Sequence, residues 1–127
     1  MTERITFGGC LCGAIRYQGR GEYHVVHCHC ADCRQSSGAP FVTWASFRTE
    51  DFHFTKGLPR EVEHDGKLRG FCAACGTTLT FRTSPEAKEW DVTVSSFDQP
   101  EAHVWIDDRL PWIKLADGLP THARSRC

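Results

Sequence analysis

The sequence predicts a mostly β fold, made of small antiparallel sheets with short connections. Several short runs alternate apolar and polar residues or concentrate β-branched and aromatic ones, as strands do. Asp65-Gly66 separates two such runs and is a strong signal for a two-residue hairpin, because both turn positions need a positive φ. No long run has the 3.6-residue period of an amphipathic helix.

The 127 residues suffice for one domain with a hydrophobic core and leave no room for a second. We expect that domain in residues 1–118 and a loose C-terminal tail in 119–127. The expected strands, in chain order, are 14–18, 23–29, 41–47, 52–55, 60–64, 67–71, 77–82 and 90–97.

The connections between these strands are expected to be short. Residues 31–37 are predicted to form one helical turn, which Gly38 and Pro40 would stop. Residues 84–89 are predicted to be a polar connection with at most one further helical turn. Near the end, 103–106 is expected to be a short apolar element and 110–113 to pack against the domain.

Charge and hydropathy restrict the partners. The formal net charge is −1 and the sequence pI is about 6.6, so there is no basic excess to favour nucleic acid or an anionic membrane. No apolar segment follows Met1, and no run approaches the roughly 18 apolar residues of a membrane span. We therefore expect a soluble, cytoplasmic protein.

The cysteines are the most informative residues. The chain has 8, and all except Cys127 fall into three tight groups: Cys10 with Cys12, Cys28 with Cys30 and Cys33, and Cys72 with Cys75. A disulfide framework is typical of short secreted chains, and no secretion signal is seen here. Buried free thiols would not cluster in this way. The spacing favours metal binding.

Two of these groups complete one another. Cys72-x-x-Cys75-Gly76 is a metal knuckle, in which the glycine allows a sharp exit. Cys10 and Cys12 are two positions apart in an extended segment, so their side chains point to the same side. Together the four thiolates would form a closed zinc site, which is structural in character.

The third group then lacks a fourth thiol. Cys28 and Cys30 face one side and Cys33 can curl back toward them, while His27 and His29 would point the opposite way. Cys127 remains, but a free thiol in the polar tail is the simpler interpretation. The sequence therefore predicts a second zinc with three protein ligands and one open position, as in catalytic zinc sites.

An open zinc with three thiolate ligands is a modest Lewis acid that suits a soft ligand, such as a substrate thiol. The predicted partners are a small thiol and a small carbonyl. Zinc thiolate sites carry negative charge, so nearby cations are expected, and Arg34 beside Cys33 and Arg69 near Cys72 are the candidates. Ordinary solvated arginines are the alternative for both.

Four segments of the chain carry a family resemblance: GCLCGAIRY at 9–17, CHCADCR at 28–34, GAPFVTW at 38–44 and FCAACGT at 71–77. Segments 96–100, 103–105 and 111–112 look like later landmarks of the same family. The chain resembles, over about residues 7–119, the glutathione-dependent formaldehyde-activating enzyme family, whose wider name includes centromere protein V.

The resemblance implies a β-tent fold with two zinc ions per chain. It implies a structural zinc at Cys10, Cys12, Cys72 and Cys75 and a catalytic zinc at Cys28, Cys30 and Cys33. The family name implies condensation of glutathione with formaldehyde to S-hydroxymethylglutathione, a carbon–sulfur lyase type of activity. No comparably clear motif marks the residues that hold glutathione.

Other residues are weaker candidates for substrate contacts. Trp44, Trp105, Phe41 and Arg34 are candidates for the pocket, although aromatic residues in β proteins are more often core. His53, His64 and His103 are candidates for moving protons. Two other functions stay open: a non-catalytic zinc-binding module, such as a β-tent binding or chaperone protein with both zincs structural, and a thiol or metal sensor.

Overall fold

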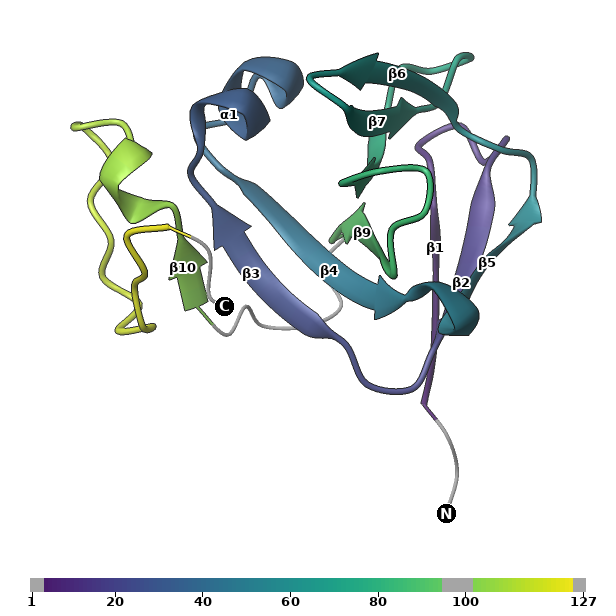
Figure 1. Ribbon diagram of the computed structural model, residues 1–127, viewed down its shortest axis with the longest axis horizontal. Coiled ribbons are helices and arrows are strands. Elements are labelled where there is room, and N and C mark those ends of the chain that lie inside the picture. The colour runs from purple at the N-terminus through teal and green to yellow at the C-terminus, as the bar shows by residue number, and fades with distance from the viewer. Residues whose placement is uncertain (1–3, 95–101, 125–127) are drawn as a thin grey trace.

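The computed structural model describes residues 4–94 and 102–124, which form two sheets, one short helix and two 3-10 turns (Figure 1). The three-stranded sheet has the order β1-β2-β5, with β1 (Ile5–Gly9), β2 (Arg16–Arg20) and β5 (Phe52–Lys56). The seven-stranded sheet has the order β10-β3-β4-β9-β8-β7-β6. Its strands are β3 (His24–Cys28), β4 (Val42–Arg48), β6 (Arg60–His64), β7 (Lys67–Phe71), β8 (Thr78–Arg82), β9 (Glu89–Thr93) and β10 (Ala102–Val104).

The mostly β prediction is confirmed, and most strands lie within two residues of their expected places. The β6–β7 hairpin turns at Asp65 and Gly66, whose φ angles are 56° and 79°. The helical turn at 31–37 is confirmed as α1 (Ala31–Ser37), which ends at Gly38 in the left-handed conformation. The last part of the predicted strand 90–97 lies outside the described residues.

Three details differ from the prediction. Strand β2 continues through Gly19, beyond the expected end at residue 18. The missing side chain of Gly19 leaves room for the ring of Phe47, with which any side chain here would collide. Strand β1 was not among the expected strands, although all of its residues pair with β2. The connection 84–88 forms bends and a turn without a helix, which the prediction allowed. Strand β10 pairs with β3 in parallel, since a long separation along the chain leaves the direction of pairing unconstrained.

The two faces of the seven-stranded sheet carry two separate clusters of buried side chains. Val25, Ala45, Phe47 and Val92 point to one face, where they form the main core together with Tyr17 and Phe52 of the small sheet. Residues one position along point to the other face, as strand geometry requires. There Val26, Trp44 and Phe81 form a second cluster with the thiols of Cys28 and Cys33.

The C-terminal segment is not a loose tail over its described part, 119–124. The backbone N–H of His103 donates to the carbonyl of Pro120 at 2.8 Å, and the N–H of His122 donates back to His103 at 2.9 Å. Thr121 thereby pairs with β10 in parallel. An unpaired strand edge offers backbone groups that a neighbouring segment can satisfy even where its side chains are polar. The division at residue 118 stays a prediction.

The expected packing of 110–113 is wrong for Trp112, which is 67% exposed. Residues 106–108 instead form the 3-10 turn η2 (Ile106–Asp108), directly after Trp105, whose φ is 55°. The other 3-10 turn, η1 (Thr49–Asp51), links β4 to β5. Within residues 4–94 and 102–124, no helix is long and apolar enough to cross a membrane.

Candidate functional site

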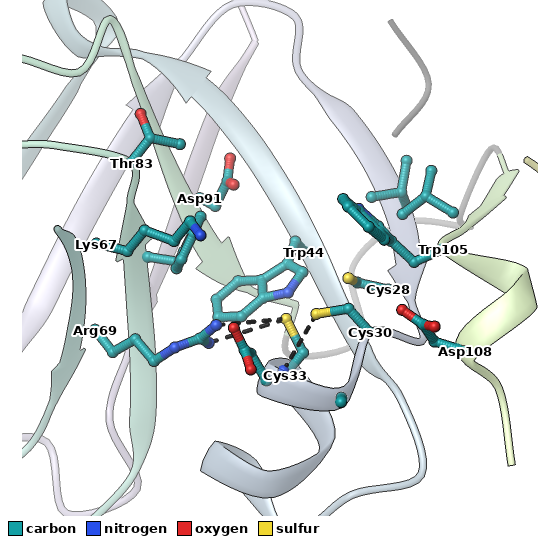
Figure 2. Close-up of a pocket in the computed structure, with 15 residues that line it drawn as sticks. Cys28, Cys30, Cys33, Trp44, Lys67, Arg69, Thr83, Asp91, Trp105 and Asp108 are labelled. Carbon is teal, nitrogen blue, oxygen red and sulfur yellow. Dashed lines mark hydrogen bonds between the residues drawn. The ribbon is translucent and has the colours of Figure 1, made fainter. Parts of the chain in front are cut away.

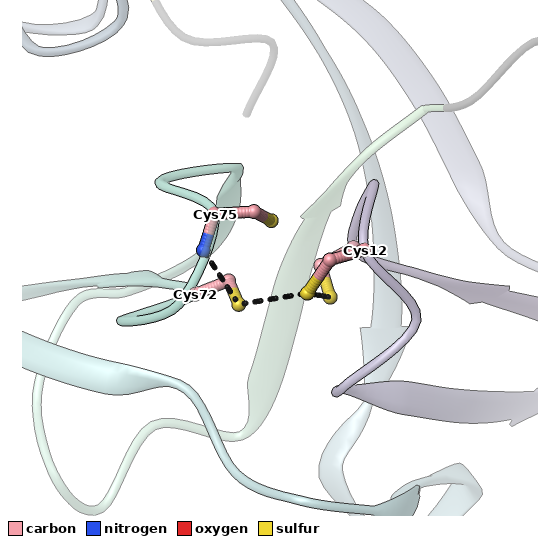
Figure 3. Close-up of side chains that lie close together, drawn as sticks. Cys12, Cys72 and Cys75 are labelled. Carbon is pink, nitrogen blue, oxygen red and sulfur yellow. Dashed lines mark hydrogen bonds between the residues drawn. The ribbon is translucent and has the colours of Figure 1, made fainter.

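Four thiols meet where the loops of two hairpins approach one another (Figure 3). Cys10 and Cys12 lie between β1 and β2, and Cys72 and Cys75 lie between β7 and β8. All four sulfurs are within 4.8 Å of one another, with 3.7 Å between Cys10 and Cys12 and 3.8 Å between Cys12 and Cys72. A tetrahedral zinc with Zn–S bonds of about 2.3 Å places its sulfurs about 3.8 Å apart. The group therefore fits such an ion.

Hydrogen bonds favour the charged form of two of these thiols, Cys10 and Cys75, whereas the pKa of Cys12, against a backbone hydrogen bond from Ala14, is raised to about 11 by its neighbours Cys10 and Cys75. The backbone N–H of Ile15 donates to Cys10 Sγ at 3.3 Å, and that of Cys75 donates to Cys72 Sγ at 3.4 Å. The Thr77 hydroxyl lies 3.1 Å from Cys75 Sγ, and this contact together with backbone N–H groups lowers the pKa of Cys75 to about 5. The N–H of Leu11 also donates to Thr77 Oγ1 at 3.1 Å, which ties the two loops together. Donors around thiolates of this kind orient metal ligands.

The second group of thiols gathers at the start of α1. Cys28 ends β3, Cys30 caps the helix and Cys33 lies in its first turn, and their sulfurs are within 4.8 Å of one another. The backbone N–H of Cys33 donates to Cys30 Sγ at 3.3 Å. Among residues 4–94 and 102–124, no further Cys, His, Asp or Glu ligand atom joins these three. Cys127 lies outside the described residues.

Negative charge in this group is concentrated on Cys33. Hydrogen bonds from Cys28 and Cys30, aided by Trp44 and by the charge of Arg69, lower the pKa of Cys33 to about 2 although burial opposes this. The guanidinium nitrogens of Arg69 lie 3.9 and 4.0 Å from Cys33 Sγ. Arg69 was expected near Cys72, which is three positions away in sequence. It serves the other cluster because its strand position faces the opposite side of the sheet.

The three-cysteine cluster opens on a cavity of about 460 Å³ on the second face of the large sheet (Figure 2). Cross-strand partners explain its floor, because residues paired directly across antiparallel strands share a face. Val26 pairs with Trp44, and Ser46 pairs with Asp91. The cavity is lined by Val26, Cys28, Cys30, Ala31, Asp32, Cys33, Trp44, Lys67, Arg69, Phe81, Thr83, Asp91, Val104, Trp105 and Asp108.

Of the four weaker candidates for substrate contacts, two line the cavity and two do not. Trp44 and Trp105 line the cavity. Phe41 does not, because its ring packs against His27 and His29 with centroids 4.7 and 5.0 Å away. Arg34 does not line it either, since its Nε donates to the backbone carbonyl of His29 at 3.2 Å. Both are corrections to the expected pocket.

The histidines lie apart from the cavity. His103 is buried between His29, whose Nε2 is 3.0 Å from His103 Nδ1, and Asp117, whose carboxylate is 2.8 Å from His103 Nε2. His27 and His29 thus face away from the thiols, as the strand alternation predicted. Both ring nitrogens of His103 have hydrogen-bond partners, and the contact with Asp117 holds that residue against β10. His53 and His64 are exposed and do not line the cavity.

Asp91 is the residue that sequence reasoning missed. It lines the cavity on β9 and is partly buried, and the hydroxyl of Ser46 donates to its carboxylate at 2.5 Å. Burial is the main reason that the pKa of Asp91 is raised to about 6, and the hydrogen bond from Ser46 only partly offsets it. The available signal was a charged residue inside a central strand, but such a pattern equally predicts a solvent-facing position.

Comparison with known proteins agrees with this arrangement. Residues 5–108 match the family described as glutathione-dependent formaldehyde-activating enzyme. A protein of Schizosaccharomyces pombe described as an uncharacterized lyase is 28% identical over 108 residues, which are 80% of this chain and 79% of that protein.

A solved structure supports the fold alone. The crystal structure of a Rhodobacter sphaeroides protein has a TM-score of 0.58 and 22% identity, and the likeness covers 92% of this chain and 99% of that one. The family match spans both cysteine clusters and all the residues that line the cavity. The chain belongs to the glutathione-dependent formaldehyde-activating enzyme family.

Proposed function

We propose that the protein is a zinc-dependent carbon–sulfur lyase or synthase. It binds a small thiol, such as glutathione, and adds it to a small carbonyl such as formaldehyde, or releases it in the reverse direction. The observation that carries the proposal is the contrast between the two thiol groups. One has four thiols and the other has three at the end of a cavity.

The proposed cofactor is zinc, two ions per chain. Cys10, Cys12, Cys72 and Cys75 would hold the structural ion, and Cys28, Cys30 and Cys33 the catalytic one. Soft thiolate donors at both sites, and sulfur spacings of 3.7 and 3.8 Å in the four-cysteine group, support this assignment over a hard cation such as magnesium. When bound, the catalytic zinc supplies a Lewis-acidic centre with one free position for the sulfur of the substrate.

The chain's own residues supply charge balance and a dry surface. The guanidinium of Arg69, next to Cys33, offsets the excess negative charge of three thiolates and a substrate thiolate. Trp44, Phe81 and Trp105 present apolar walls that exclude water from the bound sulfur and strengthen these interactions. In the addition, the sulfur–carbon bond forms as the carbonyl π bond opens, and the proton lost by the thiol ends on the new hydroxyl.

The test uses zinc-loaded protein with glutathione and formaldehyde. We expect formation of S-hydroxymethylglutathione above the uncatalysed rate, measured by NMR exchange spectroscopy. We also expect binding of glutathione but much weaker binding of S-methylglutathione, which cannot give a thiolate. Cys33→Ser should lose both effects. Protein that carries two zinc ions but neither binds the thiol nor accelerates the reaction would refute the proposal and favour the non-catalytic zinc module.

A further inference from the structure

The cavity has a charged group at the end remote from the thiols. On β4, Val42 pairs with Cys28, while Ser46, four residues further along, pairs with Asp91. At about 3.3 Å per residue, the two levels are roughly 13 Å apart along the strand. Trp44 lies on the same face halfway between them, and Figure 2 shows its indole between the sulfurs and Asp91. The cavity is therefore elongated, with thiols at one end and a carboxylate at the other.

The carboxylate of Asp91 has no cationic partner within residues 4–94 and 102–124. Its hydrogen bond there comes from a neutral hydroxyl, Ser46, and the nearby Glu89 adds repulsion. Lys67 and Arg69 also line the cavity, but neither forms an ion pair with Asp91, and the Arg69 guanidinium is placed at Cys33 and over the Phe81 ring at 4.8 Å. A partly buried carboxylate without a counter-charge is costly.

The unfavourable free energy of the partly buried carboxylate would be offset by a cation bound in the cavity. A ligand cation that entered it would meet Asp91 in a setting with apolar walls, where a charge-assisted hydrogen bond is strong. A neighbouring cavity of about 810 Å³ shares Asp91, Phe81 and Trp105, so the ligand has room beyond this point. The other acidic groups in the lining, Asp32 and Asp108, are exposed and already solvated.

We infer that Asp91 is a specificity-determining residue that binds the primary ammonium group of the thiol substrate while the sulfur is held at Cys28, Cys30 and Cys33. This rests on the proposed function. The span of roughly 13 Å requires a thiol whose ammonium is several bonds away. Glutathione separates sulfur and ammonium by eight bonds, or about 10 Å when extended, and the sulfur–metal and ammonium–carboxylate contacts cover the rest. Cysteamine is too short.

The experiment is calorimetric titration of the zinc-loaded full chain with two probes. One is glutathione and the other is N-acetylglutathione, which keeps the thiol and both carboxylates but has no ammonium. We expect unmodified protein to prefer glutathione by about tenfold or more. Asp91→Asn should lower the affinity for glutathione to that for N-acetylglutathione and leave the latter unchanged. Cysteamine should bind equally to both proteins.

Asp108→Asn is the matched control, because it removes the same charge from the same cavity at an exposed position. This variant should keep the preference for glutathione. If both variants lose the preference equally, the general negative charge of the cavity binds the ammonium group, and the specific role of Asp91 is overturned. Equal affinity of the unmodified protein for both probes would also overturn it, while leaving the proposed function intact. Binding of neither probe would overturn the proposed function as well.

Discussion

Replacing Asp91 with Asn should make the protein more stable at neutral and alkaline pH. The unfolded carboxyl has a pKa near 3.8, and in the folded protein burial raises it to about 6. The difference between these two pKa values corresponds to about 3 kcal/mol at most. Because the pKa is raised, the stabilising contribution of the neutral form is fully present below pH 3.8 and is lost as the pH rises through 6.

At pH 8 the unmodified protein therefore bears the whole cost of an ionised Asp91. The amide that replaces it in the variant carries no charge and can still accept the hydrogen bond from Ser46. We expect Asp91→Asn to gain about 1–3 kcal/mol at pH 8 and about half as much at pH 5. The assay is urea unfolding with excess zinc, followed by tryptophan fluorescence. Metal loss at pH 5 affects both proteins alike, so the difference between them isolates Asp91.

Asp108→Asn serves again as the control and should change stability by less than about 0.5 kcal/mol, because that carboxylate is exposed. A loss of stability in Asp91→Asn at pH 8 would show that the carboxylate stabilises the fold. A gain that does not shrink at pH 5 would show that ionisation is not its cause. Either result would refute the reasoning that Asp91 is maintained at a cost in stability for binding.

Further predictions concern the metal clusters and the packing. Cys72→Ser should abolish folding or solubility, since structural zinc contributes about 10 kcal/mol or more. Cys33→Ser, by contrast, should lose one zinc by elemental analysis and keep its circular dichroism spectrum. If both variants fail to fold, the second site is structural too. Arg82→Ala should lower the free energy of unfolding by about 1–2 kcal/mol in urea. The Arg82 guanidinium donates hydrogen bonds of 2.6 and 2.9 Å to the Glu61 carboxylate and lies 4.3 Å from the centre of the Trp90 ring. An unchanged urea midpoint would contradict this. Gly19→Ala should cost about 1–3 kcal/mol through collision with the Phe47 ring, and a neutral effect would mean that the ring can move aside.

Local features of the chain were predictable because their physical causes span only a few residues. The hairpin at Asp65-Gly66 follows from the backbone angles that those two positions must adopt. The convergence of Cys10 and Cys12, and the knuckle from Cys72 to Cys75, follow from side-chain direction and from tight turns. The strand alternation also predicted that His27 and His29 turn away from the thiols.

Long-range placement was decided by the tertiary structure. Arg69 is close to Cys72 in sequence but faces Cys33, because side chains alternate across the sheet and Cys33 packs on the face that carries Phe81, the cross-strand partner of Arg69. Arg34 and Phe41 are directed away from the cavity by contacts with His29. None of these contacts follows from sequence spacing, since each depends on which distant element covers a given face.

Features that depend on neighbouring residues follow from the sequence, whereas contacts between distant parts of the chain follow only from the tertiary structure. The sequence by itself determined most of the strands, the β6–β7 turn and the three groups of thiols, because backbone geometry and side-chain direction act over a few residues. Only the tertiary structure decided that the face carrying Cys28 also carries Asp91, and that residues 119–124 pair with β10. Strand alternation says which residues share a face, but the burial and charge of that face depend on strands that are remote in the chain.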